Sequence, residues 1–323
     1  MKRSRLSLLR RTVLAAALAS SALPAAALDK VHAGKSAAVA WAFIPLDVGV
    51  AAGIFQKYDL DVEITAFSGD QKMQQGVVSG GVDFGLGGGP SMAYAAKGAP
   101  EIAVAAFFGA PKNISIVVPY DSPIKSVAEL KGKLVSSSAV GSLTAWLLQR
   151  ASIDQGWGPD GIKIAALGGF EPGLAAMRTN QITAMMSSVE GGLLLEERKI
   201  GRNLTDMEKY APHFITHVIF AGTGLIKEKP EVVNRFLKGF FATIAYMKTH
   251  KAETSKVAVE ALHETTEVAD KTWDSEISSF ITDGTFEPRA LEVLKKSFID
   301  MDMMQTEPAD KDLFTTQFLP VKP

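Results

Sequence analysis

The residues best placed for binding chemistry lie between positions 80 and 98, where an apolar strand leads into three glycines, Pro90 and Ser91. A proline is typical of the first turn of a helix and a glycine of its end, so the spacing predicts a helix from Pro90 to Gly98. The first N–H groups of a helix lack internal partners, and the helix dipole makes that end positive. This end can therefore hold an anion or another acceptor, beside the Ser91 hydroxyl and with Gly89 allowing a close approach. The alternative is that the glycines only form a tight turn and Ser91 is solvated.

A second helix start of this kind is expected in the other half of the chain. Gly141, Ser142 and Thr144 lead into an apolar segment from residue 143 to about residue 155. If both helix starts face one ligand, their dipoles favour a sulfonate, a carboxylate or another acceptor group. The alternative is that Ser142 only caps its own helix.

Glu190 is the most informative acidic residue. If its carboxylate faces a ligand, it accepts hydrogen bonds from an amine, an amidine or a hydroxyl and repels a bare anion. The alternative is an acid placed at a helix start, where the dipole stabilises negative charge.

The composition excludes several classes of site. The chain has no cysteine, so it forms no disulfide, thiolate nucleophile or thiolate zinc site. His213 and His217 are four residues apart, but Pro212 and a strand-like context argue against a shared helix face, so we expect no metal. We also find no phosphate-loop motif or complete dinucleotide fingerprint, and expect no cofactor.

The N-terminus has the pattern of a secretory signal. Five Lys and Arg residues precede an apolar run and a small-residue A-x-A site at 25–27, which predicts a signal peptide over residues 1–27, cleaved near Ala27. The mature chain then has 29 basic and 35 acidic side chains, a net charge of −6. Nucleic-acid binding normally requires a basic face, so nucleic acid is a poor candidate partner.

Apolar strands alternate with helices along the mature chain. We expect strands over residues 37–44, 60–65 and 102–108, and the alternation of strands and helices begins again after residue 126. This alternation predicts α/β architecture with mostly parallel sheets. From Pro230 onward, helices dominate.

Several segments together resemble one family. They are residues 51–55, 58–63, 80–85, 121–133 and 229–233. In this order they resemble the NMT1/SsuA/TauA-like periplasmic substrate-binding proteins of ABC importers. The resemblance covers most of the mature chain but does not identify the ligand.

The resemblance implies the two-lobed type II periplasmic binding protein fold, with two hinge crossovers and a ligand between the lobes. Lobe 1 is expected to comprise residues 28–112 plus 217–323, and lobe 2 residues 113–216. Carried over residue by residue, the candidate ligand-binding positions are Phe43, Ile44, Pro45, Ser68, Gly69, Gly89, Pro90, Ser91, Ser138, Gly141, Ser142, Thr144 and Glu190. Two positions depart from the family: Thr183 stands where an Asp is frequent, and Gly191 follows Glu190 where Pro is common.

The implied function is capture of a small organic solute in the periplasm and its delivery to an ABC permease with its ATPase. A sulfonate, a carboxylate or a heteroaromatic such as a thiamine pyrimidine precursor fits this expectation, with a monomeric protein and no catalytic residue. One alternative is an enzyme, because the family fold is shared with a synthase that makes the thiamine pyrimidine precursor, although the cysteine-rich motif of that synthase is absent here. Another is a receptor that presents its ligand to a membrane sensor.

Overall fold

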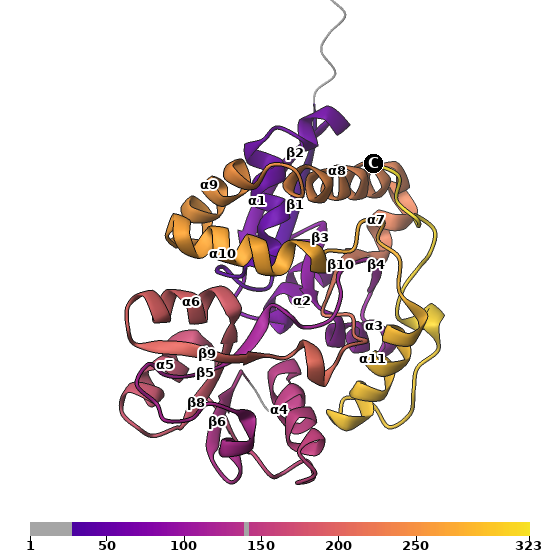
Figure 1. Ribbon diagram of the computed structural model, residues 1–323. Coiled ribbons are helices and arrows are strands. Elements are labelled where there is room, and N and C mark those ends of the chain that lie inside the picture. The colour runs from indigo at the N-terminus through magenta and orange to yellow at the C-terminus, as the bar shows by residue number, and fades with distance from the viewer. Residues whose placement is uncertain (1–27, 139–141) are drawn as a thin grey trace, which may run out of the picture.

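The structure is a computed structural model that describes residues 28–138 and 142–323, and it has two lobes, each built on a five-stranded sheet (Figure 1). The predicted signal peptide lies outside the described residues. The sheet of lobe 1 has the order β2 (Leu60–Ala66), β1 (Asp29–Lys35), β3 (Phe84–Gly88), β10 (His217–Gly222) and β4 (Glu101–Phe108). The sheet of lobe 2 has the order β7 (Lys163–Ala166), β6 (Leu134–Ser137), β8 (Ala184–Ser188), β5 (Ile114–Pro119) and β9 (Gly201–Asp206).

Each sheet is mostly parallel and contains one reversed strand. In lobe 1, β10 pairs antiparallel with both β3 and β4, while β1 pairs parallel with β2 and β3. In lobe 2, β5 pairs antiparallel with both β8 and β9, while β6 pairs parallel with β7 and β8. The reversed strands are those that enter each lobe from the other one, so the two crossovers explain the departure from an all-parallel sheet. The two-lobed α/β fold predicted from the sequence is confirmed.

Helices cover both sheets. Lobe 1 carries α1 (Ile44–Ala51), α2 (Asp70–Val78), α3 (Met92–Ala96), α7 (Thr223–Glu228), α8 (Pro230–Met247), α9 (Lys251–Leu262), α10 (Thr266–Glu276) and α11 (Pro288–Asp300). Lobe 2 carries α4 (Leu143–Asp154), α5 (Phe170–Arg178) and α6 (Val189–Glu197). Within the described part of the chain, none of the helices has both the length and the apolar character needed to cross a membrane.

The strand expected over residues 37–44 is wrong. The first strand is β1, at Asp29–Lys35, in which Val31 and Ala33 are buried. The apolar residues that follow form a 3-10 turn, Trp41–Phe43, and then α1, with Pro45 in its first turn. A short apolar run does not by itself distinguish a buried strand from a buried helix start, and the proline favours the helix.

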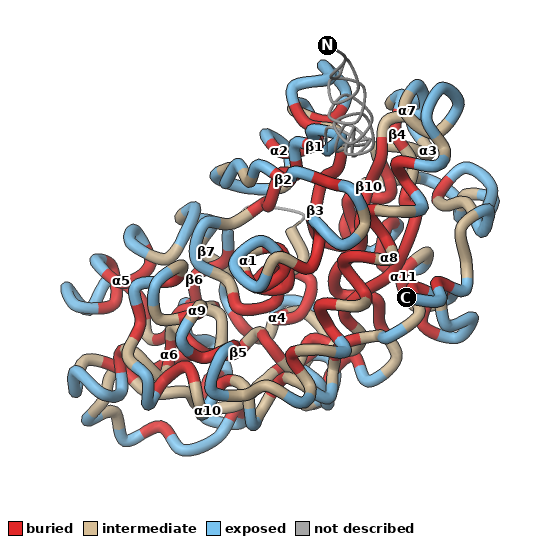
Figure 2. Tube along the Cα trace, turned by 90° about the horizontal axis from the view of Figure 1, so that it is seen from above, coloured by how far each residue is buried: buried red, intermediate tan, exposed pale blue. Residues whose placement is uncertain are grey.

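The core of lobe 1 is organised around the apolar stripe of α8, and buried segments concentrate there and on the strands (Figure 2). Phe236 lies between two other rings, with its centroid 5.5 Å from that of Phe55 and 3.9 Å from that of Phe84. All three side chains are fully buried. Ring pairs in such an arrangement stabilise the core beyond the area that they bury.

Phe236→Ala is therefore expected to lower the free energy of unfolding by about 3–5 kcal/mol, because it removes a buried ring and leaves a cavity. Denaturant unfolding measures this loss. Ile299→Ala is a suitable control, because that side chain is 42% exposed on α11. A Phe236→Ala protein no less stable than the control would contradict this account of the core.

Candidate ligand-binding site between the lobes

The predicted site residues follow the carboxyl ends of strands in both lobes. The segments after β1, β2 and β3 supply those of lobe 1, and the segments after β6 and β8 supply those of lobe 2. The carboxyl ends of parallel strands meet at one edge of a sheet, where open α/β sheets bind their ligands.

The end of β3 packs closely against the crossover that returns to lobe 1. The Gly89 amide donates to the Thr216 carbonyl at 2.8 Å, and a Cβ at Gly89 would lie 2.1 Å from the Ile215 oxygen. Pro90 and Ser91 are buried beside it. The helix that begins here, α3, has only five residues after its 3-10 turn. Close backbone packing therefore accounts for the glycine at position 89.

The residues after β2 are more exposed. Ser68 accepts a hydrogen bond from Lys72 Nζ at 2.9 Å, and the Gly69 amide donates to the Ser36 carbonyl at 2.8 Å. Gly69 has a φ of +109°, which favours glycine, and it precedes the first residue of α2. These two residues form the loop that starts the helix.

In lobe 2, three predicted hydroxyls lie in one cluster at the start of α4. Thr144 Oγ1 is 3.0 Å from the Ser138 amide nitrogen, the Ser138 Oγ and the Ser142 Oγ. Ser142 Oγ also caps α4 by accepting from the Ala145 amide at 3.3 Å. The fourth predicted residue here, Gly141, lies outside the described residues. The cap that we considered as the alternative role of Ser142 is present.

Glu190 joins the two lobes. It lies in the first turn of α6, and its Oε1 accepts a hydrogen bond from the Trp41 amide of lobe 1 at 2.9 Å. The start of α6 is fixed in place, because the Val189 amide donates to the Asn113 carbonyl at 3.0 Å and Asn203 Nδ2 donates to the Val189 carbonyl at 3.0 Å. Burial raises the pKa of Glu190 to about 7, although the Trp41 amide acts to lower it.

Two more buried carboxyls lie near Glu190, and the sequence did not reveal them. Glu264 follows α9 and Glu276 ends α10, and both charges interact with that of Glu190. Burial, together with the charge of Glu190, raises the pKa of Glu264 to about 8. Burial, together with both other carboxylates, raises the pKa of Glu276 well above its usual value, and Lys112 opposes this shift. We call Glu190, Glu264 and Glu276 the carboxyl cluster.

Aromatic rings extend from the carboxyl cluster toward the crossovers. The Trp41 ring centroid is 5.6 Å from that of Phe280, which in turn is 5.1 Å from that of Phe108. Next along is His217, whose ring centroid lies 5.8 Å from Phe108 and 4.9 Å from the predicted residue Phe43. Ile44 and Pro45 are buried at the start of α1.

His217 connects the two crossovers. Its Nε2 lies 3.0 Å from Asn113 Nδ2. Burial lowers the pKa of His217 to about 4, so the ring is neutral at physiological pH and its Nε2 can accept from the Asn113 amide. The sequence analysis considered this histidine only as a metal ligand. No group of three or more His, Asp or Glu side chains that could hold a metal ion occurs in residues 28–138 and 142–323.

The two lobes also meet at the surface. α10 lies against α6 (Figure 1), and a hollow of about 180 Å³ between them is lined by Glu196 and Glu197 of lobe 2 and by Glu267 and Lys271 of lobe 1. On the other side, Trp146 Nε1 of α4 donates to Asp300 Oδ2 of α11 at 3.0 Å. These contacts hold the lobes against one another, with the carboxyl cluster between them.

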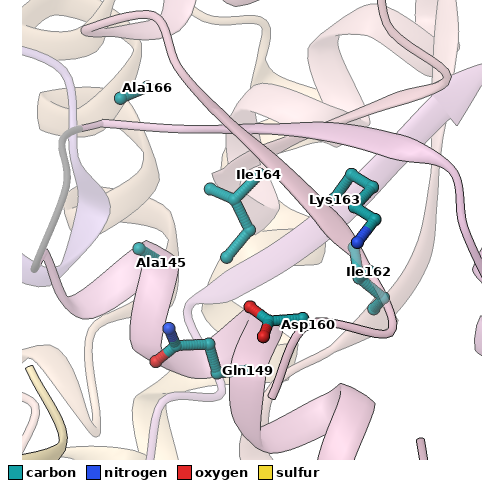
Figure 3. A pocket seen from close by; sticks show the side chains of 7 residues that line it. All are labelled: Ala145, Gln149, Asp160, Ile162, Lys163, Ile164 and Ala166. Atoms are coloured by element: carbon teal, nitrogen blue, oxygen red, sulfur yellow. The ribbon is translucent and has the colours of Figure 1, made fainter. Parts of the chain in front are cut away.

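A second hollow, of about 240 Å³, lies within lobe 2 (Figure 3). It is bordered by α4 and β7, and its polar lining residues are Gln149, Asp160 and Lys163. None of the predicted ligand-binding residues lines it. It is therefore separate from the site between the lobes.

The comparisons with known proteins agree with this architecture. A family model described as NMT1/THI5 like matches residues 41–254. The alkanesulfonate-binding protein SsuA from Xanthomonas axonopodis pv. citri, bound to MOPS, is similar with a TM-score of 0.75 at 17% identity, covering 88% of this chain and 98% of that one. The periplasmic aliphatic sulphonate binding protein SsuA from Escherichia coli gives the same TM-score and identity, covering 88% and 92%.

An enzyme has the same fold. The desulfurization enzyme DSZB is similar with a TM-score of 0.66 at 15% identity, covering 90% of this chain and 97% of that one. No curated protein sequence matches the chain. At these identities the structural likenesses show the fold, which is that of the periplasmic binding proteins. The match to the family model extends over more than half of the sequence and confirms the predicted resemblance: the chain belongs to the NMT1/THI5-like family.

Proposed function

We propose that this protein is the solute-binding component of an ABC importer and that it captures a small organic solute between its two lobes. The observation that carries the proposal is the contact between Glu190 of lobe 2 and the Trp41 amide of lobe 1, which is buried and adjoins polar atoms without partners. A binding protein of this type closes around its solute, so groups that would contact the solute come from both lobes. The fold and the family support this role.

In this proposal the mature protein is a periplasmic monomer, exported through the signal peptide and cleaved near Ala27. Lobe 1 comprises residues 28–112 plus 217–323, and lobe 2 residues 113–216. The candidate solutes are sulfonates, carboxylates and heteroaromatic compounds, and the protein hands the bound solute to a membrane permease and ATPase. The predicted residues from both lobes, including Ser91, Ser142 and Glu190, surround it.

Thermal unfolding in the presence of candidate solutes tests the proposal. A solute that binds only the folded protein stabilises it by about 2.7 kcal/mol at a concentration of 100 Kd. We expect at least one member of a panel of sulfonates, carboxylates, nitrate, amines and pyrimidines to raise the melting temperature. Glu190→Gln should weaken that binding, while Glu260→Gln, an exposed residue on α9, should not. Absence of any shift across the panel would contradict the proposal.

The second candidate function is an enzyme on the same scaffold, because the desulfurization enzyme DSZB has this fold. Incubation of the protein with members of the panel, followed by mass spectrometry, distinguishes the two functions. Recovery of the compounds unchanged supports the binding protein, whereas product formation supports the enzyme. Capture of a membrane sensor in place of a permease would indicate a receptor that presents its ligand.

A further inference from the structure

The carboxyl cluster is rich in hydrogen-bond acceptors that have no partner. Among the described residues, Glu190 Oε2, Glu264 Oε1 and both carboxyl oxygens of Glu276 are buried without a hydrogen bond. The Glu276 side chain is fully buried, and Glu190 and Glu264 belong to residues that are 6% and 7% exposed. Buried acceptors without partners destabilise a protein, so these four atoms need an explanation, and a bound group that supplies hydrogen-bond donors provides one.

Trp41 provides an independent indication of a ligand. Its main chain binds the Glu190 carboxyl, its side chain is fully buried, and its indole Nε1 has no partner in the described residues. An indole N–H that is buried usually finds an acceptor. One donor and four acceptors therefore lack partners in the cluster and in the residue whose amide binds it, and a molecule that supplies several N–H donors would satisfy most of the acceptors.

The charges near the carboxyl cluster also indicate a ligand. Lys112 is the cation that acts on Glu276, and it is half-buried at the edge of lobe 1. His217, at the start of β10, is neutral at physiological pH. Lys112 offsets the charge of Glu276 alone, so full ionisation of the three buried carboxyls would leave an excess of negative charge, which must be neutralised by protons or by a cation.

The aromatic residues indicate the shape of that cation. The buried rings of Trp41, Phe280 and Phe108 contact one another in series, and Trp41 is joined to the cluster through its amide, which binds Glu190. A flat or compact apolar body packs favourably on such rings, and a cation beside an aromatic face gains further stabilisation. The described residues hold no group of carboxylates and histidines with the arrangement of a metal site, which favours an organic cation.

We infer that the solute is a small organic cation carrying several N–H donors, an ammonium or an amidinium on a flat apolar body, whose charged nitrogen group binds Glu190, Glu264 and Glu276. This inference rests on the proposed function and specifies its substrate class. It argues against the sulfonates and carboxylates that the two helix starts alone would favour, because an anion would oppose ionisation of the carboxyl cluster, whereas a cation stabilises its ionised form.

Three compounds of the same shape test the inference: benzamidine, a cation; benzamide, which is neutral; and benzoate, an anion. They are measured at neutral pH by thermal shift and calorimetry, beside alkyl amines, aminopyrimidines and sulfonates. We expect cations to bind most tightly and anions not to bind. Benzoate or a sulfonate binding more tightly than every amine and amidine would overturn the inference and leave the proposed function intact. Binding of no compound at all would overturn both.

Single-residue variants then test which carboxyl groups bind the charged nitrogen group of the solute. Glu276→Gln should weaken binding of the tightest cation by about tenfold or more, because a charge-assisted hydrogen bond is lost. Glu264→Gln should act in the same direction and serves if Glu276→Gln does not fold. Glu260→Gln, an exposed residue on α9, should leave affinity within about twofold. Unchanged cation affinity in both cluster variants would overturn the inference.

Discussion

Raising the pH from about 6.5 to about 8.5 is expected to lower the free energy of unfolding of the ligand-free protein by several kcal/mol. The cause is the carboxyl cluster. The pKa of Glu190 is raised to about 7 and that of Glu264 to about 8, and burial with both neighbouring charges raises that of Glu276 well above 4.5. The folded state therefore binds more protons than the unfolded state above about pH 4.5, and stability falls as the pH rises through these folded-state values.

Two titratable residues outside the carboxyl cluster also change how stability depends on pH, and they determine where the measurement should begin. Glu101, whose pKa burial raises to about 7, adds to the fall. His217 acts in the opposite direction, because burial lowers its pKa to about 4 and its contribution to stability grows until about pH 6.5. The measurement therefore begins above that pH.

Urea unfolding at a series of pH values measures the slope. Glu276→Gln should flatten the fall, because it removes one group that must ionise while buried next to Glu190 and Glu264. A cationic solute bound to the cluster should also reverse the fall, because it favours the ionised carboxylates. A stability that stays constant or rises over this range would contradict the assignment of three buried carboxyls.

The second large effect is expected at Gly89. Gly89→Ala should destabilise the protein by about 3 kcal/mol, because the added Cβ meets backbone that cannot rotate away. That Cβ would lie 2.1 Å from the Ile215 oxygen and 3.2 Å from the Ile215 carbonyl carbon. Relief of this clash would separate the Gly89 amide from the Thr216 carbonyl, which it now binds at 2.8 Å.

Gly224→Ala is the matched control for this prediction. Gly224 lies in the first turn of α7, and a Cβ there would meet no atom within 4 Å. Its replacement should change the free energy of unfolding by less than about 0.5 kcal/mol. If the two variants unfold at the same denaturant concentration, the tight contact between β3 and the returning crossover does not exist.

Local patterns in the sequence predict most of the fold. Alternating apolar residues identified β2, and the spacing of Val233, Phe236, Phe240 and Ile244 identified α8. The segment at 121–133 that carries part of the family resemblance contains a capping box, in which Ser126 and Glu129 bind each other's backbone at the start of a short helix. Each of these signals arises from neighbours in the chain, which is why the sequence contains it.

Contacts between distant segments could not be predicted in this way. Glu190 was identified because it starts a helix after a strand. Glu264 precedes α10 and Glu276 ends it, and among the other acidic residues of α10, Glu267 and Asp274 are exposed and Asp270 is half-buried. The burial of Glu264 and Glu276 depends on how α10 packs against α6 of the other lobe. Tertiary packing decided this outcome. The apolar run at 37–44 was misassigned for another reason: the first strand lies earlier, at β1, and Pro45 in the first turn of α1 is a local signal that favours a helix.

The most direct test is a crystal structure of the protein with the compound that stabilises it most. The account predicts that the compound lies between the lobes beside Trp41, with a nitrogen within hydrogen-bonding distance of Glu276 and of Glu190. A compound bound instead in the hollow beside α4 and β7, or held by the hydroxyls of Ser138 and Thr144 with no contact to the carboxyl cluster, would contradict it.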